Sequence, residues 1–138
     1  RYPKEIKAGQ VSDNIVLNLD FAPTFLDYAG ISASNGMQGQ SLRLITEGVQ
    51  PLDWRKSMYY HYYEYPHGWH FVKRHYGIRT DRYKLIHFYN DIDSWELYDL
   101  ENDPNEIKNL IYDMNYSQIT AKLKNELYSL KKSFGETE

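Results

Sequence analysis

Four runs rich in aromatic and β-branched residues decide the expected fold: SMYYHYYEY (57–65), FVKRHYGIR (71–79), YKLIHFY (83–89) and WELYDL (95–100). Turn-forming residues separate these runs, namely Pro66-His67-Gly68, Thr80-Asp81 and Asn90-Asp91. Such runs are typical of strands, and short connections between them favour antiparallel neighbours. The stretch therefore predicts an antiparallel meander of about four strands.

A helix is expected after the meander. Downstream of Asp103-Pro104, apolar residues recur at helical spacing: Ile119, Leu123, Leu127, Leu130 and Phe134. This pattern predicts a helix from about Tyr116 to Phe134, with one apolar stripe that needs a sheet face to cover it. The expected fold class of this half is therefore α+β, with a four-stranded antiparallel sheet packed by a C-terminal helix.

The first third of the chain predicts short helices instead of strands. Asp20 is expected to cap a helix that tolerates Pro23 in its first turn and ends at Gly30. Ser41 is expected to cap a second helix, which Gly48 ends. The polar connection over residues 46–55 is the expected hinge. We therefore divide the chain into residues 1–50 and residues 51–138.

Composition bounds the functional classes. The chain has 138 residues, of which 41% are hydrophobic and 16% aromatic, so it can bury one modest core. Sixteen basic and nineteen acidic residues give a net charge of −3 without a basic block, so no nucleic-acid partner is expected. No stretch approaches the length of a membrane span, so no membrane partner is expected either. The chain has no cysteine, which excludes disulfides, thiolate metal sites and a cysteine nucleophile.

No hydrolytic centre can be assembled from the sequence. The chain contains no Gly-x-Ser-x-Gly elbow, no His-Glu-x-x-His pair and no phosphate-binding glycine loop. The acidic run from Asp99 to Asn105 lacks the turn glycine of a calcium loop and carries Pro104, so we interpret it as a strand end and a turn. Asp91 and Asp93 are interpreted as turn residues. We therefore expect neither catalytic nor metal-binding residues in this chain.

Histidines are concentrated in one place. His61, His67, His70 and His75 fall within fifteen residues, among tyrosines, Trp69, Lys73 and Arg74. Aromatic rings cover sugar C–H surfaces, while imidazole and cationic groups bind hydroxyls, carboxylates or sulfates. We therefore predict that the substrate-binding residues are His67, His70, Arg74 and His75. The alternative interpretation is a strand with one solvated face followed by an ordinary loop. His87, on the next strand, is interpreted as structural.

Several segments resemble type I sulfatases. LDFAPTFLDYAGI (19–31), followed by MQGQSL (37–42), resembles the stretch that closes the sulfatase catalytic domain. YGIRTDRYKLI (76–86) and ELYDLENDPNE (96–106), with Asn109-Leu110, resemble the sulfatase C-terminal subdomain. The segments YYHYYEY (59–65) and VKRHYG (72–77) are similar to segments of polysaccharide-degrading sulfatases of gut Bacteroidetes, including those acting on N-acetylglucosamine 6-sulfate.

The resemblance implies a fold and an activity. Residues 1–50 would be the terminal helical segment of an alkaline-phosphatase-like α/β catalytic domain, and residues 51–138 the C-terminal subdomain. The activity would be sulfuric ester hydrolysis, which in this family uses a formylglycine made from Cys or Ser beside a calcium ion. Both are expected upstream of Arg1, so this chain alone is expected to be inactive. The motif positions taken as scaffold are Asp20, Pro23, Arg79, Lys84, Tyr98 and Pro104.

The resemblance also implies a partner and a compartment. The partner would be a sulfated carbohydrate bound by the complete enzyme, as in glycosaminoglycan degradation, and the location periplasmic or secreted. Two other classes stay open. One is a freestanding carbohydrate-binding module. The other is a purely structural segment, which would expose apolar surface and self-associate through it.

Overall fold

The chain forms two compact units, which are described separately. The computed structural model describes residues 2–136, and the units divide between Arg55 and Lys56. The division falls at the end of the polar connection that we expected to act as a hinge. Assigning the two parts to a catalytic domain and a C-terminal subdomain stays a prediction.

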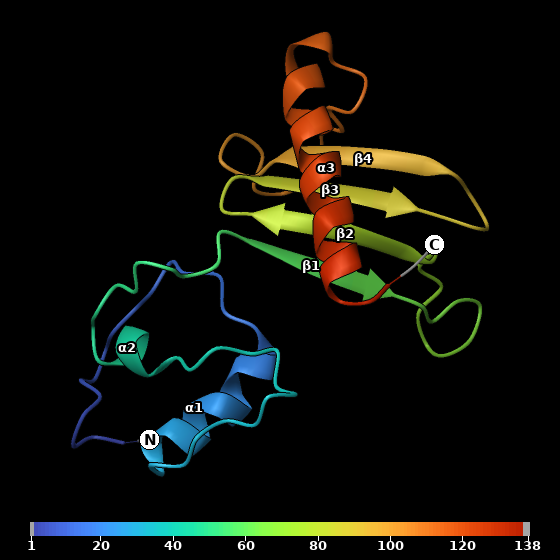
Figure 1. Ribbon diagram of the computed structural model, residues 1–138. Coiled ribbons are helices and arrows are strands. Elements are labelled where there is room, and N and C mark those ends of the chain that lie inside the picture. The colour runs from blue at the N-terminus through green and yellow to red at the C-terminus, as the bar shows by residue number, and fades with distance from the viewer. Residues whose placement is uncertain (1, 137–138) are drawn as a thin grey trace. The chain divides into compact units, whose positions relative to one another are not determined.

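The first unit contains the expected short helices. A 3₁₀ turn over Asn18–Asp20 (η1) leads into α1 (Phe21–Tyr28), and α2 spans Arg43–Thr46 (Figure 1). Pro23 lies in the first turn of α1, where its missing N–H costs no helical hydrogen bond. Gly30, with φ of 71°, follows the end of α1 in the left-handed conformation that glycine adopts without strain.

Of the two capping predictions, that for Asp20 is wrong, whereas Ser41 does bind the N–H of the first residue of α2. Asp20 precedes α1, but its side chain caps nothing there and instead accepts the N–H of Leu17 at 2.8 Å and of Gln40 at 2.9 Å. Arg55 donates to both oxygens of the same carboxylate, at 2.5 and 2.6 Å. For α2 the residue before the helix is Leu42, which makes no side-chain cap. Ser41 lies one residue earlier; its hydroxyl accepts the N–H of Arg43 at 3.2 Å and donates to Asp27 Oδ2 at 2.6 Å.

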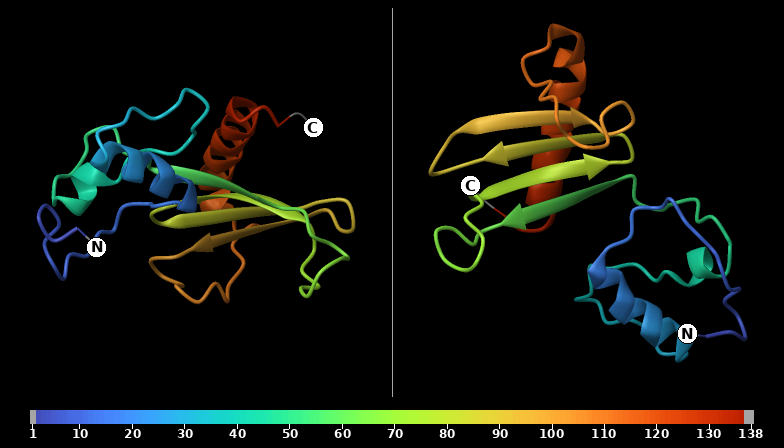
Figure 2. Two further views of the ribbon diagram at one scale, coloured as in Figure 1. Left: turned by 90° about the horizontal axis from the view of Figure 1, so that it is seen from below. Right: turned by 180° about the vertical axis from the view of Figure 1, so that it is seen from behind.

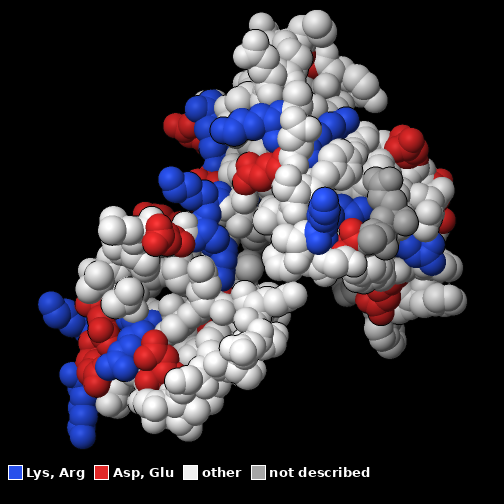
Figure 3. All heavy atoms as spheres, viewed as in Figure 1, with Lys and Arg blue, Asp and Glu red and all other residues white. Residues whose placement is uncertain are grey.

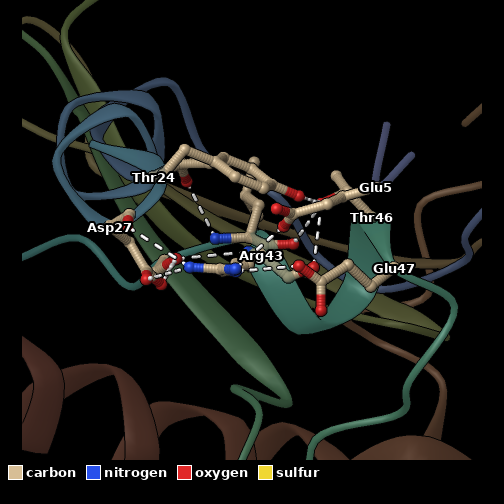
Figure 4. A network of polar contacts seen from close by, with 9 residues as sticks. Glu5, Thr24, Asp27, Arg43, Thr46 and Glu47 are labelled. Atoms are coloured by element: carbon tan, nitrogen blue, oxygen red, sulfur yellow. Dashed lines mark hydrogen bonds and ion pairs between the residues drawn. The ribbon is translucent and has the colours of Figure 1, made fainter. Parts of the chain in front are cut away.

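Arg43 links the short helices of the first unit (Figure 4). Its guanidinium pairs with Glu47 at 2.8 Å, with Glu5 at 2.8 Å and with Asp27 at 3.3 Å. The guanidinium also lies over the Tyr28 ring, 5.0 Å from its centroid. Residues from the chain start, α1 and α2 thereby meet at one side chain.

The second unit is the predicted meander. Its strands β1 (Ser57–Tyr62), β2 (His75–Thr80), β3 (Tyr83–Phe88) and β4 (Ser94–Asp99) form one antiparallel sheet in the order β1-β2-β3-β4. The α+β fold class, with a four-stranded antiparallel sheet and a C-terminal helix, is confirmed.

The second strand is shorter than the sequence predicts. We expected it to begin near Phe71, but β2 begins at His75, opposite Tyr62. β1 ends at Tyr62, so residues 71–74 have no strand to pair with and belong to the connection. The β1–β2 connection therefore spans residues 63–74, longer than the Pro66-His67-Gly68 turn alone.

The C-terminal helix covers one face of the sheet, as its apolar stripe requires. A 3₁₀ turn over Met114–Tyr116 (η2) leads into α3 (Ser117–Ser133), which lies on a single side of the sheet in all three ribbon views (Figures 1 and 2). Leu127 is fully buried, as are Ile78, Leu85 and Leu97, which come from three neighbouring strands. Leu123 joins the same core cluster, and Leu130 and Ile119 pack against it.

Cationic side chains border the same face. Lys and Arg side chains flank α3 in Figure 3, and two of them lie over aromatic rings of the sheet. Lys124 Nζ is 3.9 Å from the Trp95 ring centroid, and Lys131 Nζ is 3.9 Å from that of Tyr76. Their aliphatic stems extend the apolar cover of the helix while their charges face electron-rich rings.

The packing of α3 gives a first prediction. Changing Leu127→Asp is expected to lower the free energy of unfolding by about 3 to 5 kcal/mol, because it places an unpaired charge in the core. Chemical denaturation with far-UV circular dichroism measures this change. Asn125→Asp puts the same charge on an exposed position of α3 and should have a small effect. Equal stabilities of the two variants would place Leu127 outside the core.

Candidate functional site

The two faces of β1 carry different partners. Tyr59 faces α3, since its ring stacks with Phe134 at 6.1 Å and contacts Tyr76. Tyr60 and Tyr62 point to the other face, where both rings contact His75. All six β1 residues are partly buried, so the strand does not have the single solvated face of the alternative interpretation.

The β1–β2 connection projects two of the four predicted residues into solvent. His67 and His70 are exposed, and within the described part of the chain neither makes a hydrogen bond or an ion pair. Between and beside them, Trp69 is 96% exposed and Phe71 is 81% exposed. The tip of this connection thus presents imidazoles and large aromatic rings that have no role in packing the second unit.

Arg74 instead holds the base of the connection. Its guanidinium donates from Nε to the carbonyl of Tyr63 at 3.2 Å and from Nη2 to the carbonyl of Tyr65. It also lies 4.0 Å from the carboxylate of Asp91, in the β3–β4 turn. Lys73 adds a bond to the Tyr65 hydroxyl at 2.6 Å. These contacts give Arg74 a bracing role, and sugar contact by Arg74 stays a prediction.

His75 lies at the start of β2, packed among aromatic rings. It stacks on Tyr62 at 5.3 Å and contacts Phe88 at 5.2 Å. Its Nδ1 is 2.8 Å from the carbonyl of Lys73, which can only accept, so Nδ1 carries a proton. A neutral His75 therefore keeps Nε2 as an acceptor. The four predicted residues thus differ in their surroundings: His67 and His70 are exposed, Arg74 holds the backbone of the connection, and His75 is packed among aromatic rings.

A polar cluster that the sequence did not predict lies on the helix-facing side. Its five members are Tyr59, His61, Tyr63, Tyr89 and Glu136, and we call it the Glu136 cluster. Glu136 follows α3 and accepts from Tyr59 at 2.5 Å, from His61 Nδ1 at 2.9 Å and from Tyr63 at 3.1 Å. His61 Nε2 is 2.6 Å from the hydroxyl of Tyr89. The alternation of residues 59, 61 and 63 was visible in the sequence, but nothing local points to Glu136.

Hydrogen bonding sets the protonation of this cluster. Burial raises the pKa of the Glu136 carboxyl, but the bonds from Tyr59, His61 and Tyr63 outweigh it and hold the pKa below its usual value. Burial and the bond to Glu136 raise the pKa of Tyr59. The cluster therefore carries a carboxylate and neutral phenols at neutral pH, a stable arrangement of one acceptor and several donors.

The remaining acidic and histidine candidates have internal partners. His87 contacts the Tyr76 hydroxyl and Asp93 Oδ1, both at 2.8 Å, and stacks on Trp95 at 4.1 Å. These contacts support its structural interpretation. Asp99 accepts from Arg82, and Asp103 accepts the N–H of Lys108. Among residues 2–136, no three His, Cys, Asp or Glu side chains are placed to hold a metal ion.

Over residues 2–136, no helix combines the length and the apolar character needed to cross a bilayer.

A meander covered by one C-terminal helix, preceded by short helices, is the architecture of the C-terminal part of a sulfatase, and comparison with known proteins bears this out. The family model for the C-terminal region of N-sulphoglucosamine sulphohydrolase matches residues 1–133. The chain belongs to this family, which confirms the resemblance to type I sulfatases.

Individual relatives agree with the family. An N-acetylglucosamine-6-O-sulfatase of Bacteroides thetaiotaomicron is 52% identical over 140 residues, which cover 100% of this chain and 25% of the relative. Human arylsulfatase K is 31% identical, covering 91% of this chain and 24% of its own length. The chain thus spans about a quarter of the length of these relatives and matches the C-terminal part of carbohydrate sulfatases.

Solved structures give the same fold. A structure of a protein in complex with its substrate D-glucosamine-2-N,6-O-disulfate matches with a TM-score of 0.94 and 51% identity, covering 100% of this chain and 28% of that one. A 2-O glycosaminoglycan sulfatase matches with a TM-score of 0.75 and 29% identity, and the match covers 90% of this chain and 27% of that one.

The bracing contacts of Arg74 give a second prediction. Arg74→Met removes the donors to two carbonyls, so amide hydrogen exchange over residues 63–73 is expected to accelerate about tenfold, while the strands keep their protection. Hydrogen–deuterium exchange with mass spectrometry measures this. His70→Ala, at an exposed position without such contacts, is the matched control and should leave exchange unchanged. Unchanged exchange in Arg74→Met would remove the bracing role.

Proposed function

We propose that this chain is the C-terminal part of a carbohydrate sulfatase that hydrolyses 6-O-sulfate esters of N-acetylglucosamine or related glucosamine units. The observation that carries the proposal is the 52% identity to an N-acetylglucosamine-6-O-sulfatase across the whole chain. The match to a structure holding a glucosamine 2-N,6-O-disulfate supports the same substrate class. We further propose glycosaminoglycan degradation, in the periplasm or outside the cell, as the setting of this activity.

Within such an enzyme, the β1–β2 connection would contact the sugar. His67 and His70 are exposed beside Trp69, and the braced base holds the tip at the end of the sheet. Imidazoles exchange hydrogen bonds with hydroxyl groups, an indole face covers sugar C–H groups, and the neighbouring Lys73 attracts the anionic ester. His75, packed against Tyr62 and Phe88, would present its Nε2 acceptor from the sheet itself.

The sulfate-ester chemistry would belong to another part of the enzyme. This chain has no cysteine and no serine in a formylglycine motif, and its acidic run from Asp99 to Asp103 forms a strand end and a turn. We place the formylglycine and the calcium ion in the part of the sulfatase that precedes this chain. The formylglycine would supply the nucleophile and the calcium ion would stabilise the sulfate charge, while this chain binds and orients the sugar.

The alternative function, a purely structural segment, is favoured by an exposed aromatic pair in the first unit. Phe21 and Phe25 stack along α1 while remaining 50% and 68% exposed. Exposed aromatic pairs of this kind mark surfaces that another protein segment covers. This chain expressed by itself would then self-associate through α1.

A third prediction concerns activity. The purified 138-residue chain is expected to show no hydrolysis of aryl sulfates or of 6-O-sulfated glucosamines above a buffer blank, because it lacks a nucleophile motif. Sulfate release followed by ion chromatography measures this. Turnover that persists through purification and follows the chain in every fraction would overturn the assignment of the chemistry to another part.

A fourth prediction concerns the sugar contacts. In the complete sulfatase, His67→Ala is expected to lower kcat/KM for the sulfated sugar by roughly tenfold to thousandfold, equivalent to about 1.4 to 4 kcal/mol. A small aryl sulfate, which cannot reach the connection, should be affected far less. His75→Ala should act similarly, with some loss of stability from the broken ring stack. Lys108→Ala, outside the connection, is the control. Wild-type kinetics of both histidine variants on both substrates would leave the connection without a role in binding.

A further inference from the structure

We propose that Glu136, acting through Tyr63, is a positioning residue for the β1–β2 connection and thereby sets the affinity for the sugar. The inference rests on the proposed function, in which this connection contacts substrate. It assigns a role to the Glu136 cluster, which no sequence motif marked.

The cluster joins three elements at the end of β1 from which the connection leaves. Tyr59 and His61 come from β1, and Tyr63 is the first residue after it. Tyr89 follows β3, and Glu136 follows α3. Because residues 59, 61 and 63 alternate along an extended strand, their side chains all reach the helix-facing side, where one carboxylate receives them.

Tyr63 is the residue through which the cluster reaches the connection. Its hydroxyl donates to Glu136 Oε1 at 3.1 Å, and its ring stacks on His61 with centroids 3.8 Å apart. Its carbonyl accepts from Arg74 Nε at 3.2 Å, at the far end of the connection. Tyr63 is thus fixed from both sides, by Glu136 through its side chain and by Arg74 through its backbone.

A carboxylate suits this position because it binds all three donors with charge-assisted hydrogen bonds. Both oxygens accept, so one Glu136 side chain serves two phenol hydroxyls and an imidazole N–H. In a glutamine, the oxygen could still accept from Tyr59 and His61, and the NH₂ group could donate to the Tyr63 hydroxyl, but the charge-assisted hydrogen bonds would become weaker neutral ones. The change conserves size, so packing around Phe134 and Tyr59 stays the same and the effect isolates the hydrogen bonds.

The experiment uses the complete sulfatase with Glu136→Gln and Tyr63→Phe. Both variants are expected to raise KM for the sulfated sugar about tenfold, with kcat within about twofold and aryl sulfate kinetics unchanged. Amide exchange over residues 64–73 should accelerate in both variants. Tyr63→Phe keeps the ring stack on His61, so it tests the hydroxyl alone. Glu101→Gln is the control, since Glu101 is an exposed carboxylate whose partner is Arg82.

Three results would overturn the inference. The first is unchanged exchange and KM in Glu136→Gln. The second is faster exchange without a change in KM for the sugar. The third is an equal loss on sugar and aryl substrates together with a lower melting temperature, which would indicate general destabilisation. His67→Ala separates this inference from the proposed function. If His67→Ala impairs sugar turnover while Glu136→Gln does not, only the positioning role fails. If both are neutral, the proposed sugar contact fails as well.

Discussion

A carboxylate removed from water has to be paired, and each of the two units is organised around one such group. Asp20 is completely buried, and its carboxylate accepts hydrogen bonds from two backbone N–H groups and from both Nη atoms of the Arg55 guanidinium. Asp99 is 1% exposed, and its carboxylate accepts hydrogen bonds from the side chains of Arg82 and Asn102. Burying either carboxylate without these donors would cost several kcal/mol, so the segments that supply the donors are held in place. In the first unit those segments are the chain before η1, the loop before α2 and the end of the unit. In the second they are the β2–β3 turn and the end of β4.

The second unit could be predicted largely from its sequence because its information is local. Aromatic runs separated by turn residues define β1 to β4, and the apolar spacing from Ile119 to Leu130 defines α3. The register, not the composition, decides where each strand ends. Residues 71–74 are as rich in strand-forming side chains as β2 itself, yet β1 ends at Tyr62 and leaves them without a partner on that strand.

The sequence-based predictions fail where a side chain binds a partner distant in the sequence instead of a local one. Asp20 has the sequence position of a helix cap, but Gln40 and Arg55 lie 20 and 35 residues away and leave no spacing signal. An ion pair with one arginine and hydrogen bonds from two backbone N–H groups stabilise a carboxylate more than the N–H groups of one helix terminus do. Glu136 was missed for the same reason, since its donors on β1 lie more than 70 residues before it. Composition was enough to propose four sugar-binding residues, and their role stays a prediction; only their contacts separate the bracing Arg74 from the exposed His67 and His70.

The division between a fixed base and an exposed tip has a physical consequence for binding. A flexible loop loses conformational entropy when it closes on a ligand, and that loss is subtracted from the affinity. In the β1–β2 connection, Arg74 and Lys73 order the base before any ligand arrives, while the Glu136 cluster fixes Tyr63, where the connection begins. Side chains such as Trp69 then add contact area with only two rotatable bonds to restrict. In the proposed sulfatase, selectivity among glycans would therefore depend on the bracing contacts as well as on the side chains of the tip, because the bracing contacts determine where the tip is held.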